Sequence, residues 1–136
     1  MPNLDPNIFG SSLWKSVHFI ALGFPDNPDD QQKQQYAIWF HNLSNVIPCE
    51  KCAFEYSKLL EKYPPDDYMT DSLSLFQWTV FIHNEVNDTL GKQRLSFNEA
   101  LRKITEQPPY ITLTQNHCIY LGSMFVLILF IVLFYK

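Results

Sequence analysis

The cysteine pair in Cys49-Glu50-Lys51-Cys52 is the part of the sequence with the clearest chemistry. Pro48 precedes it and good helix formers follow it, so we expect both sulfurs in the first turn of a helix. Unpaired backbone N–H groups and the positive end of the helix dipole favour a thiolate there. Such a pair is typical of a dithiol that cycles with a disulfide. Half of a zinc site and two inert buried cysteines remain open as alternatives.

A second set of candidates lies in the helix expected over residues 6–22, where Gly10, Trp14 and His18 are spaced four residues apart. This spacing places the three residues on one face of the helix. A glycine in such a stripe permits close approach of a backbone or a ligand. Taken alone, the stripe is more typical of a packed core than of a cofactor site.

A third set follows the apolar part of a helix expected from residue 71 or 72 to residue 90, with Gly91 as its C-cap. Val80, His83 and Asn87 fall on one side of this helix, and Asn84 lies next to them. Asparagine is a poor helix former and needs hydrogen-bond partners when buried. A frayed helix end with solvated side chains is the alternative, but the apolar residues before the set favour a polar site on the inner face.

The elements that position these candidates all have helical patterns, and no segment shows sustained alternation with period two. We therefore expect an all-α fold. Besides the two helices above, we expect a second helix at about 31–46, a third from the cysteine pair to just before Pro64, a loop over 66–72, and a short helix from the capping box Ser96–Glu99 to about Thr105.

The composition limits the classes of function. A chain of 136 residues fits one domain. Its net charge of -4 gives no support for nucleic-acid binding, which usually needs a basic patch. Only three cysteines are present, Cys49, Cys52 and Cys118, so the chain does not carry a framework of structural disulfides.

The C-terminal stretch 119–135 carries no charge, and its length is near the short end of the ~17–25 residues that a membrane-spanning helix needs. Tyr120 and Tyr135 bracket it as interfacial aromatics do. We predict a transmembrane helix over 118–135 after a linker over 108–117; a buried C-terminal helix is the alternative. The N-terminus lacks the pattern of a signal peptide, so we expect a single-pass C-terminal anchor with the domain over 1–107 facing the cytosol.

Three motifs in order along the chain resemble the Erv/ALR family of FAD-linked sulfhydryl oxidases, over about residues 7–103. The motifs are Gly10-x-x-x-Trp14-x-x-x-His18, then Pro48-Cys49-x-x-Cys52-Ala53, then Trp78-x-x-x-x-His83-Asn84-x-Val86-Asn87-x-x-Leu90-Gly91-Lys92. The small size resembles the virus-encoded members. The resemblance implies a four-helix bundle plus a short fifth helix around FAD, and homodimers are common in the family.

The resemblance also implies roles for individual residues. Cys49 matches the cysteine that the substrate thiolate attacks, and Cys52 matches the cysteine next to the flavin. The positions that match the FAD site are Gly10, Trp14, His18, His83, Asn84, Val86, Asn87 and Lys92.

The chain departs from the family pattern in several places. Ile47 replaces an aromatic residue, Val80 replaces a cysteine, and Thr89 stands where a basic residue is frequent. A C-terminal tryptophan segment over the adenine and a second Cys-x-x-Cys pair are both absent from the sequence. We therefore expect the substrate to reach Cys49 directly.

These observations predict a membrane-tethered, FAD-dependent thiol oxidase. It would oxidise two thiols of a substrate protein to a disulfide and pass the electrons through Cys49, Cys52 and FAD to dioxygen, giving hydrogen peroxide. Expected partners are dithiol proteins, including a thioredoxin-like carrier, and the expected role is disulfide formation during virion assembly, at a virion or host membrane. One alternative is a membrane-anchored zinc module that uses the cysteine pair and two of His18, His41 and His83. Another is a membrane-anchored adaptor whose cysteine pair is incidental.

Overall fold

The structure is a computed structural model that describes residues 3–106, and residues up to Thr105 form one compact unit. This part of the chain contains helices and no strand, which confirms the all-α prediction. The elements are α1 (Pro6–Leu22), α2 (Asp30–Leu43), α3 (Glu50–Lys62), the short 3-10 helix η1 (Pro65–Tyr68), α4 (Ser72–Thr89) and α5 (Phe97–Thr105).

Local capping explains where most of the helices begin. Asp5, Asp29 and Asp71 each accept a hydrogen bond from a backbone N–H in the first turn of α1, α2 and α4. At α5 the predicted capping box forms, because the backbone N–H of Ser96 donates to Glu99 Oε2 at 2.8 Å and the Ser96 hydroxyl accepts from the Glu99 N–H. These contacts satisfy N–H groups that the helices themselves leave unpaired.

Two helix ends test the sequence predictions in opposite ways. The sequence predicts that α2 continues to residue 46, but the helix ends at Leu43. Beyond it, the N–H groups of Asn45 and Val46 donate to carbonyls three residues earlier, in turns rather than in an α-helix. α4 ends as predicted, with Gly91 in the left-handed conformation at a φ of 64°. The N–H of Lys92 then bonds to the carbonyl of Asn87 at 2.8 Å, which fixes the start of the segment that leads to α5.

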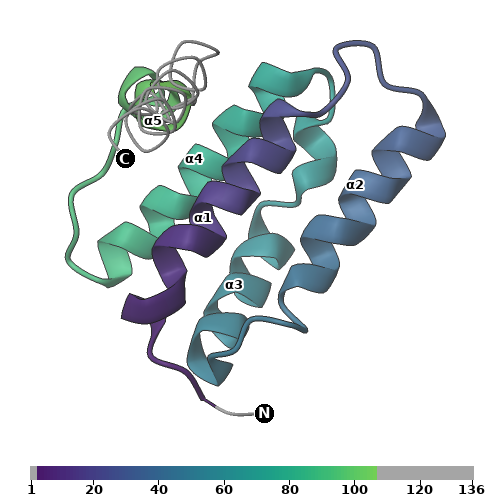
Figure 1. Ribbon diagram of the computed structural model, residues 1–136. Coiled ribbons are helices and arrows are strands. Elements are labelled where there is room, and N and C mark those ends of the chain that lie inside the picture. The colour runs from purple at the N-terminus through teal and green to yellow at the C-terminus, as the bar shows by residue number, and fades with distance from the viewer. Residues whose placement is uncertain (1–2, 107–136) are drawn as a thin grey trace, which may run out of the picture. The chain divides into compact units, whose positions relative to one another are not determined.

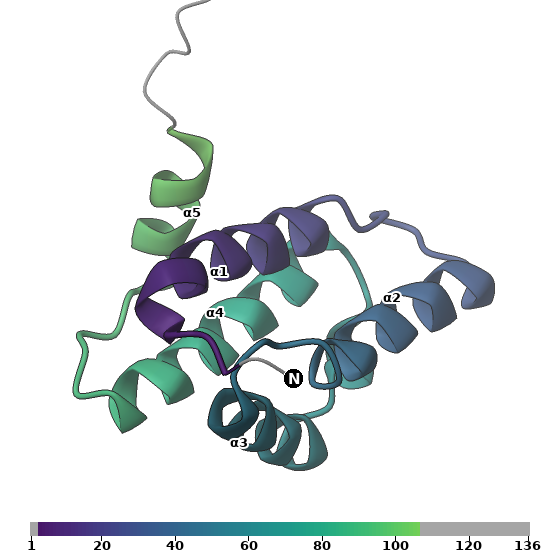
Figure 2. The same cartoon turned by 60° about the horizontal axis from the view of Figure 1, so that its bottom comes forward.

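The core lies where α4 packs against the other helices. α1 and α4 lie side by side, as Figures 1 and 2 both show. Leu75, Phe76, Trp78 and Ile82 of α4 are fully buried. The Trp78 indole N–H donates to the Tyr63 carbonyl at 3.0 Å, so this large side chain is held by a polar contact as well as by packing.

The predicted membrane span and its linker are not part of what the structure describes. Within residues 3–106, no helix is both long enough and apolar enough to cross a membrane. The predicted linker over 108–117 and the predicted span over 118–135, with Cys118, lie outside the described residues.

Candidate functional site

The cysteine pair forms a disulfide at the N-terminus of α3. Cys49 is the N-cap residue, and its sulfur accepts a hydrogen bond from the backbone N–H of Cys52 at 3.2 Å. The two Cα atoms lie 5.2 Å apart. The sequence prediction that both sulfurs sit at a helix start is therefore confirmed. After reduction, the free N–H groups of this first turn would stabilise a thiolate on Cys49.

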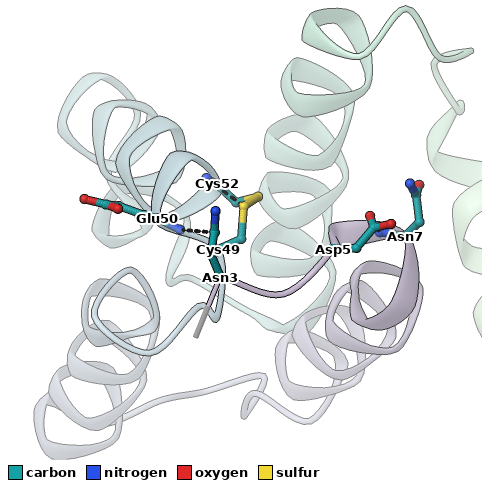
Figure 3. Close-up of a disulfide and its surroundings, with 6 residues drawn as sticks. All are labelled: Asn3, Asp5, Asn7, Cys49, Glu50 and Cys52. Carbon is teal, nitrogen blue, oxygen red and sulfur yellow. Dashed lines mark hydrogen bonds between the residues drawn. A yellow bond between two sulfur atoms is a disulfide. The ribbon is translucent and has the colours of Figure 1, made fainter. Parts of the chain in front are cut away.

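The N-terminal segment Asn3–Leu4 lies against the loop that carries Cys49, which sequence reasoning missed. The Leu4 N–H donates to the Pro48 carbonyl at 2.7 Å, and Asn3 Oδ1 accepts from the Glu50 N–H at 3.2 Å (Figure 3). Cys49 is only 7% exposed, whereas Cys52 is half-buried. No local signal links residues 3 and 50, because the contact joins positions 47 residues apart.

An open hollow lies beside the same end of α3. Asn3, Glu50, Lys51 and Phe54 line it. The Phe54 side chain is largely exposed there, with 61% of the residue accessible, and Lys58 Nζ lies 4.7 Å from the centre of its ring. The hollow therefore offers one apolar ring among polar and charged groups at the N-terminal end of α3.

The stripes predicted on α1 and α4 meet in a cluster of aromatic rings. The rings of Trp14 and His83 stack with their centroids 4.1 Å apart and their planes within 3°. His18 Nε2 lies 3.0 Å from His83 Nδ1, and the His18 ring meets the edge of Phe76 at 5.4 Å between centroids. Trp14 is partly buried against the core and His18 is buried, so the two residues contribute the α1 side of this ring cluster.

Burial keeps both histidines of this cluster neutral near pH 7. Desolvation, followed by the influence of His83, lowers the pKa of His18 from 6.5 to about 3. Desolvation, followed by the charges of Lys92 and Lys103, lowers the pKa of His83 from 6.5 to about 4. The two rings therefore exchange one hydrogen bond between neutral imidazoles.

Thr79 is a member of the cluster that sequence reasoning missed. Its Oγ1 lies 2.8 Å from His18 Nδ1, and the residue is fully buried on α4. The available signal was spacing, because Thr79 precedes His83 by one helical turn and must share its face. The sequence alone does not show whether a threonine in an apolar helix contacts a polar group on another helix.

Asn84 is buried, but its amide is engaged by the protein itself. The side-chain N–H donates to the Leu95 carbonyl at 2.8 Å, and the side-chain oxygen accepts from the Leu95 N–H at 2.9 Å. Asn87 is also buried, while Val86 is half-buried. The alternative of a frayed helix end is wrong, because α4 stays regular to Thr89 and these asparagines face inward.

The remaining predicted site residues border the cluster. A Cβ atom added at Gly10 would meet nothing within 4 Å, so there is open space one helical turn from Trp14. No contact within the described chain requires a glycine at this position. Lys92 is exposed in the segment that leaves α4, and its charge acts on His83.

The residues of the zinc alternative have other contacts. Cys49 and Cys52 are joined to each other, His18 and His83 share a hydrogen bond, and His41 Nε2 lies 3.1 Å from Asp66 on the surface. In the part of the chain that the structure describes, no three His, Cys, Asp or Glu side chains converge to hold a metal ion. The geometry there gives the zinc alternative no support.

Comparison with known proteins identifies relatives of the chain. Residues 11–107 match the Erv1 / Alr family. The "Probable FAD-linked sulfhydryl oxidase R368" of Acanthamoeba polyphaga mimivirus is 37% identical over 102 residues, which cover 74% of this chain and 71% of that protein. The mitochondrial FAD-linked sulfhydryl oxidase erv1 of Schizosaccharomyces pombe is 31% identical, and the match covers 71% of this chain and 53% of that protein.

The fold is also similar to solved structures. The crystal structure of the yeast Erv1 core superimposes with a TM-score of 0.70 at 26% identity, covering 78% of this chain and 88% of that one. The FAD binding domain of Erv1 from Saccharomyces cerevisiae gives a TM-score of 0.70 at 27% identity and is covered to 99%. The helices that carry the cysteine pair and the ring cluster therefore have the arrangement of a known FAD-binding domain.

Proposed function

The chain belongs to the Erv1 / Alr family, and from that premise we propose that it is an FAD-linked sulfhydryl oxidase that makes disulfides in substrate proteins. The observation that carries the proposal is the Cys49–Cys52 disulfide at the first turn of α3, in a fold similar to an FAD binding domain. A disulfide placed there is a ready oxidant for dithiols, because the helix N-terminus stabilises the thiolate that is released.

The ring cluster fits a planar cofactor such as FAD. Trp14 and His83 form a flat stacked surface, and open space lies over Gly10. Lys92 supplies positive charge close to His83, as a pyrophosphate requires. Trp14, His83, Val86, Asn87 and Lys92 are the residues that would hold FAD directly. His18 is buried with both ring nitrogens engaged, so it would act through His83. Asn84 would act through Leu95, by fixing the segment between α4 and α5.

Substrate oxidation starts at Cys49. A substrate thiolate attacks the Cys49 sulfur, the Cys49–Cys52 bond breaks, and Cys52 leaves as a thiolate while a mixed disulfide forms. A second substrate thiolate then attacks the substrate sulfur of that mixed disulfide, which releases oxidised substrate and leaves Cys49 reduced. The pair now holds the two electrons of the substrate, and the two protons go to the cysteine thiols or to solvent. Bound FAD supplies the chemistry that carries these electrons to dioxygen, giving hydrogen peroxide.

The N-terminal segment has to be considered in this reaction, because Cys49 is almost inaccessible. In-line attack on its sulfur requires an approach along the S–S axis, and Asn3 and Leu4 lie against the same loop. The hollow lined by Asn3, Glu50 and Phe54 is at the same end of α3 as the disulfide, and a substrate peptide would lie there. Its exposed phenylalanine would contact an apolar residue next to the substrate cysteine.

The wider role is part of the same proposal. Residues 118–135 anchor the protein in a virion or host membrane with the catalytic domain facing the cytosol, and the protein acts as a homodimer. Dithiol proteins assembled into virions, or a thioredoxin-like carrier, supply the electrons. The uncharged stretch 119–135 supports the anchor, and the relatives from mimivirus and African swine fever virus support the viral setting. Protease digestion of sealed membrane vesicles tests the orientation, since a head protected inside the lumen would contradict it.

The proposed activity is tested with the purified full chain and its Cys52→Ser variant. The wild type should show flavin absorption bands that dithiothreitol bleaches under nitrogen and air restores. Cys52→Ser should retain the flavin and lose oxygen consumption, while Cys118→Ser, as a control cysteine variant, should keep turnover. Turnover by Cys52→Ser, or a wild-type chain that cannot take up FAD, would contradict the proposal.

A further inference from the structure

We propose that Thr79 is a positioning residue which, through His18, makes His83 Nε2 a hydrogen-bond acceptor for a donor group of the bound cofactor. This inference rests on the proposed function for the identity of the cofactor. It concerns a residue at an unspecified position of the third motif, between Trp78 and His83. It depends on the direction of three consecutive hydrogen bonds.

The first bond fixes the hydroxyl proton of Thr79. Its Oγ1 lies 2.7 Å from the Phe76 carbonyl oxygen, one turn back along α4. Two oxygens approach this closely only with a proton between them, and a carbonyl cannot donate. The Thr79 hydroxyl therefore donates to Phe76, a bond that threonine commonly makes inside a helix.

The second bond then has only one possible direction. Thr79 Oγ1 lies 2.8 Å from His18 Nδ1, and its proton is already engaged, so it accepts from this nitrogen. His18 must carry its proton on Nδ1. Because His18 is only 4% exposed and has a pKa of about 3, it is neutral, and its Nε2 carries a lone pair.

The third bond transmits this choice to His83. His18 Nε2 and His83 Nδ1 lie 3.0 Å apart and share one proton, which must come from His83. His83 is also neutral near pH 7, with a pKa of about 4, so its Nε2 carries no proton. Among residues 3–106 this nitrogen has no hydrogen-bond partner.

A bare ring nitrogen at the edge of the Trp14–His83 stack selects a particular class of ligand group. It accepts from an N–H or O–H donor and repels a carbonyl or phosphate oxygen. FAD offers hydroxyl, amine and ring N–H donors of this class. The opposite tautomer of His83 would present a donor instead, so the hydroxyl of Thr79 decides which groups the site favours.

Three variants separate this role from simple packing. Thr79→Val keeps the branched shape but removes the acceptor, which releases His18 to donate from Nε2 and His83 to carry its proton on Nε2. Thr79→Ser keeps the hydroxyl. Thr89→Val is the matched control, because the Thr89 hydroxyl makes the same kind of bond, to the Val86 carbonyl at 2.8 Å, at the exposed end of α4.

The readout is the tautomer of each histidine in the full chain, by two-dimensional ¹⁵N–¹H NMR of ring-labelled protein at pH 7, without and with FAD. His41→Gln and His117→Gln assign the other two histidines. The wild type, Thr79→Ser and Thr89→Val should show Nδ1–H on both His18 and His83, whereas Thr79→Val should show substantial Nε2–H on both. The dissociation constant for FAD should rise about 2- to 10-fold in Thr79→Val alone, as expected for one neutral hydrogen bond.

An Nε2–H tautomer of His83 in the wild type would overturn the inference, as would a Thr79→Val variant with unchanged tautomers and FAD affinity. A wild-type chain that binds no FAD would overturn the proposed function instead. The tautomers of the FAD-free protein would still decide whether Thr79 sets the state of His83, so the two failures are distinguishable.

Discussion

Lowering the pH from 7 to 5 should destabilise the folded chain, because His18 is buried in its neutral form. Its pKa is about 3 in the folded state and 6.5 as the ordinary value of an unfolded chain. Between these values the unfolded chain binds a proton that the folded chain does not, so the free energy of unfolding falls as the pH falls from 6.5 towards 3. Above pH 6.5 both states are neutral, and His18 has almost no effect on the pH dependence.

The magnitude follows from the same two pKa values. Each pH unit well below 6.5 costs about 1.4 kcal/mol, so His18 alone should remove about 2 kcal/mol between pH 7 and pH 5. His83 acts in the same direction, since its pKa is lowered to about 4. It is more exposed than His18, and with solvent screening we expect it to add about 1 kcal/mol.

Urea unfolding of the FAD-free full chain at pH 5, 6, 7 and 8, followed by tryptophan fluorescence, measures this effect. His18→Gln should lower stability at every pH, because a buried contact is lost. The informative quantity is the difference in unfolding free energy between pH 7 and pH 5, which should shrink by about 2 kcal/mol in this variant. Thr89→Val is the control: it removes an exposed hydroxyl that does not titrate between pH 5 and pH 8, so it should leave that difference unchanged.

An unchanged difference in His18→Gln, to within about 0.5 kcal/mol, would refute the reasoning. It would mean that His18 is protonated or solvated in the folded state. The assigned chain of hydrogen bonds from Phe76 to His83 would then fail as well, because it requires a neutral His18.

Three further outcomes are expected. Asn84→Ala should lower the free energy of unfolding by about 2 kcal/mol in urea titrations, because the N–H and the carbonyl of Leu95 both lose their hydrogen-bond partner. An unchanged value would show that the segment between α4 and α5 is stable without the Asn84 side chain. Trp78→Phe should cost about 2 kcal/mol in the same assay, through a smaller ring in the core and an unpaired Tyr63 carbonyl; a neutral result would contradict the assigned packing. Removing residues 1–4 should speed reduction of the Cys49–Cys52 disulfide by a reduced thioredoxin-like protein up to about tenfold, because two hydrogen bonds no longer cover the loop. A small phosphine reductant is the control there, and equal acceleration of both reagents would argue against a steric role.

Helix boundaries were the most predictable part of the fold, because their signals are local. Asp5 and Pro6 start α1, the Ser96–Glu99 box starts α5, and Gly91 ends α4, each through atoms within a few residues. The end of α2 was placed three residues too late. Its apolar period continues through Val46, but the backbone there already turns into the loop that carries Cys49.

The candidate site was predictable as a set of residues and much less as a set of contacts. Spacing put Trp14 and His18 on one stripe and His83 on another, and the structure brings these stripes together. The sequence predicts that Asn84 contacts FAD, whereas in the structure its amide binds the backbone of Leu95. Spacing places Thr79 on the same face of α4 as His83, but its role depends on His18, which lies on another helix and is 61 positions away in the sequence.

By itself, then, the sequence determined the helical class, most of the capped ends and a cysteine pair at the first turn of α3. All of these depend on interactions between residues near one another in the chain. Tertiary structure alone decided which faces meet, because burying the apolar side of α4 against α1 joins His18 to His83 across 65 positions. The same burial removes water from both imidazoles and lowers their pKa values, and no pattern of neighbouring residues specifies that.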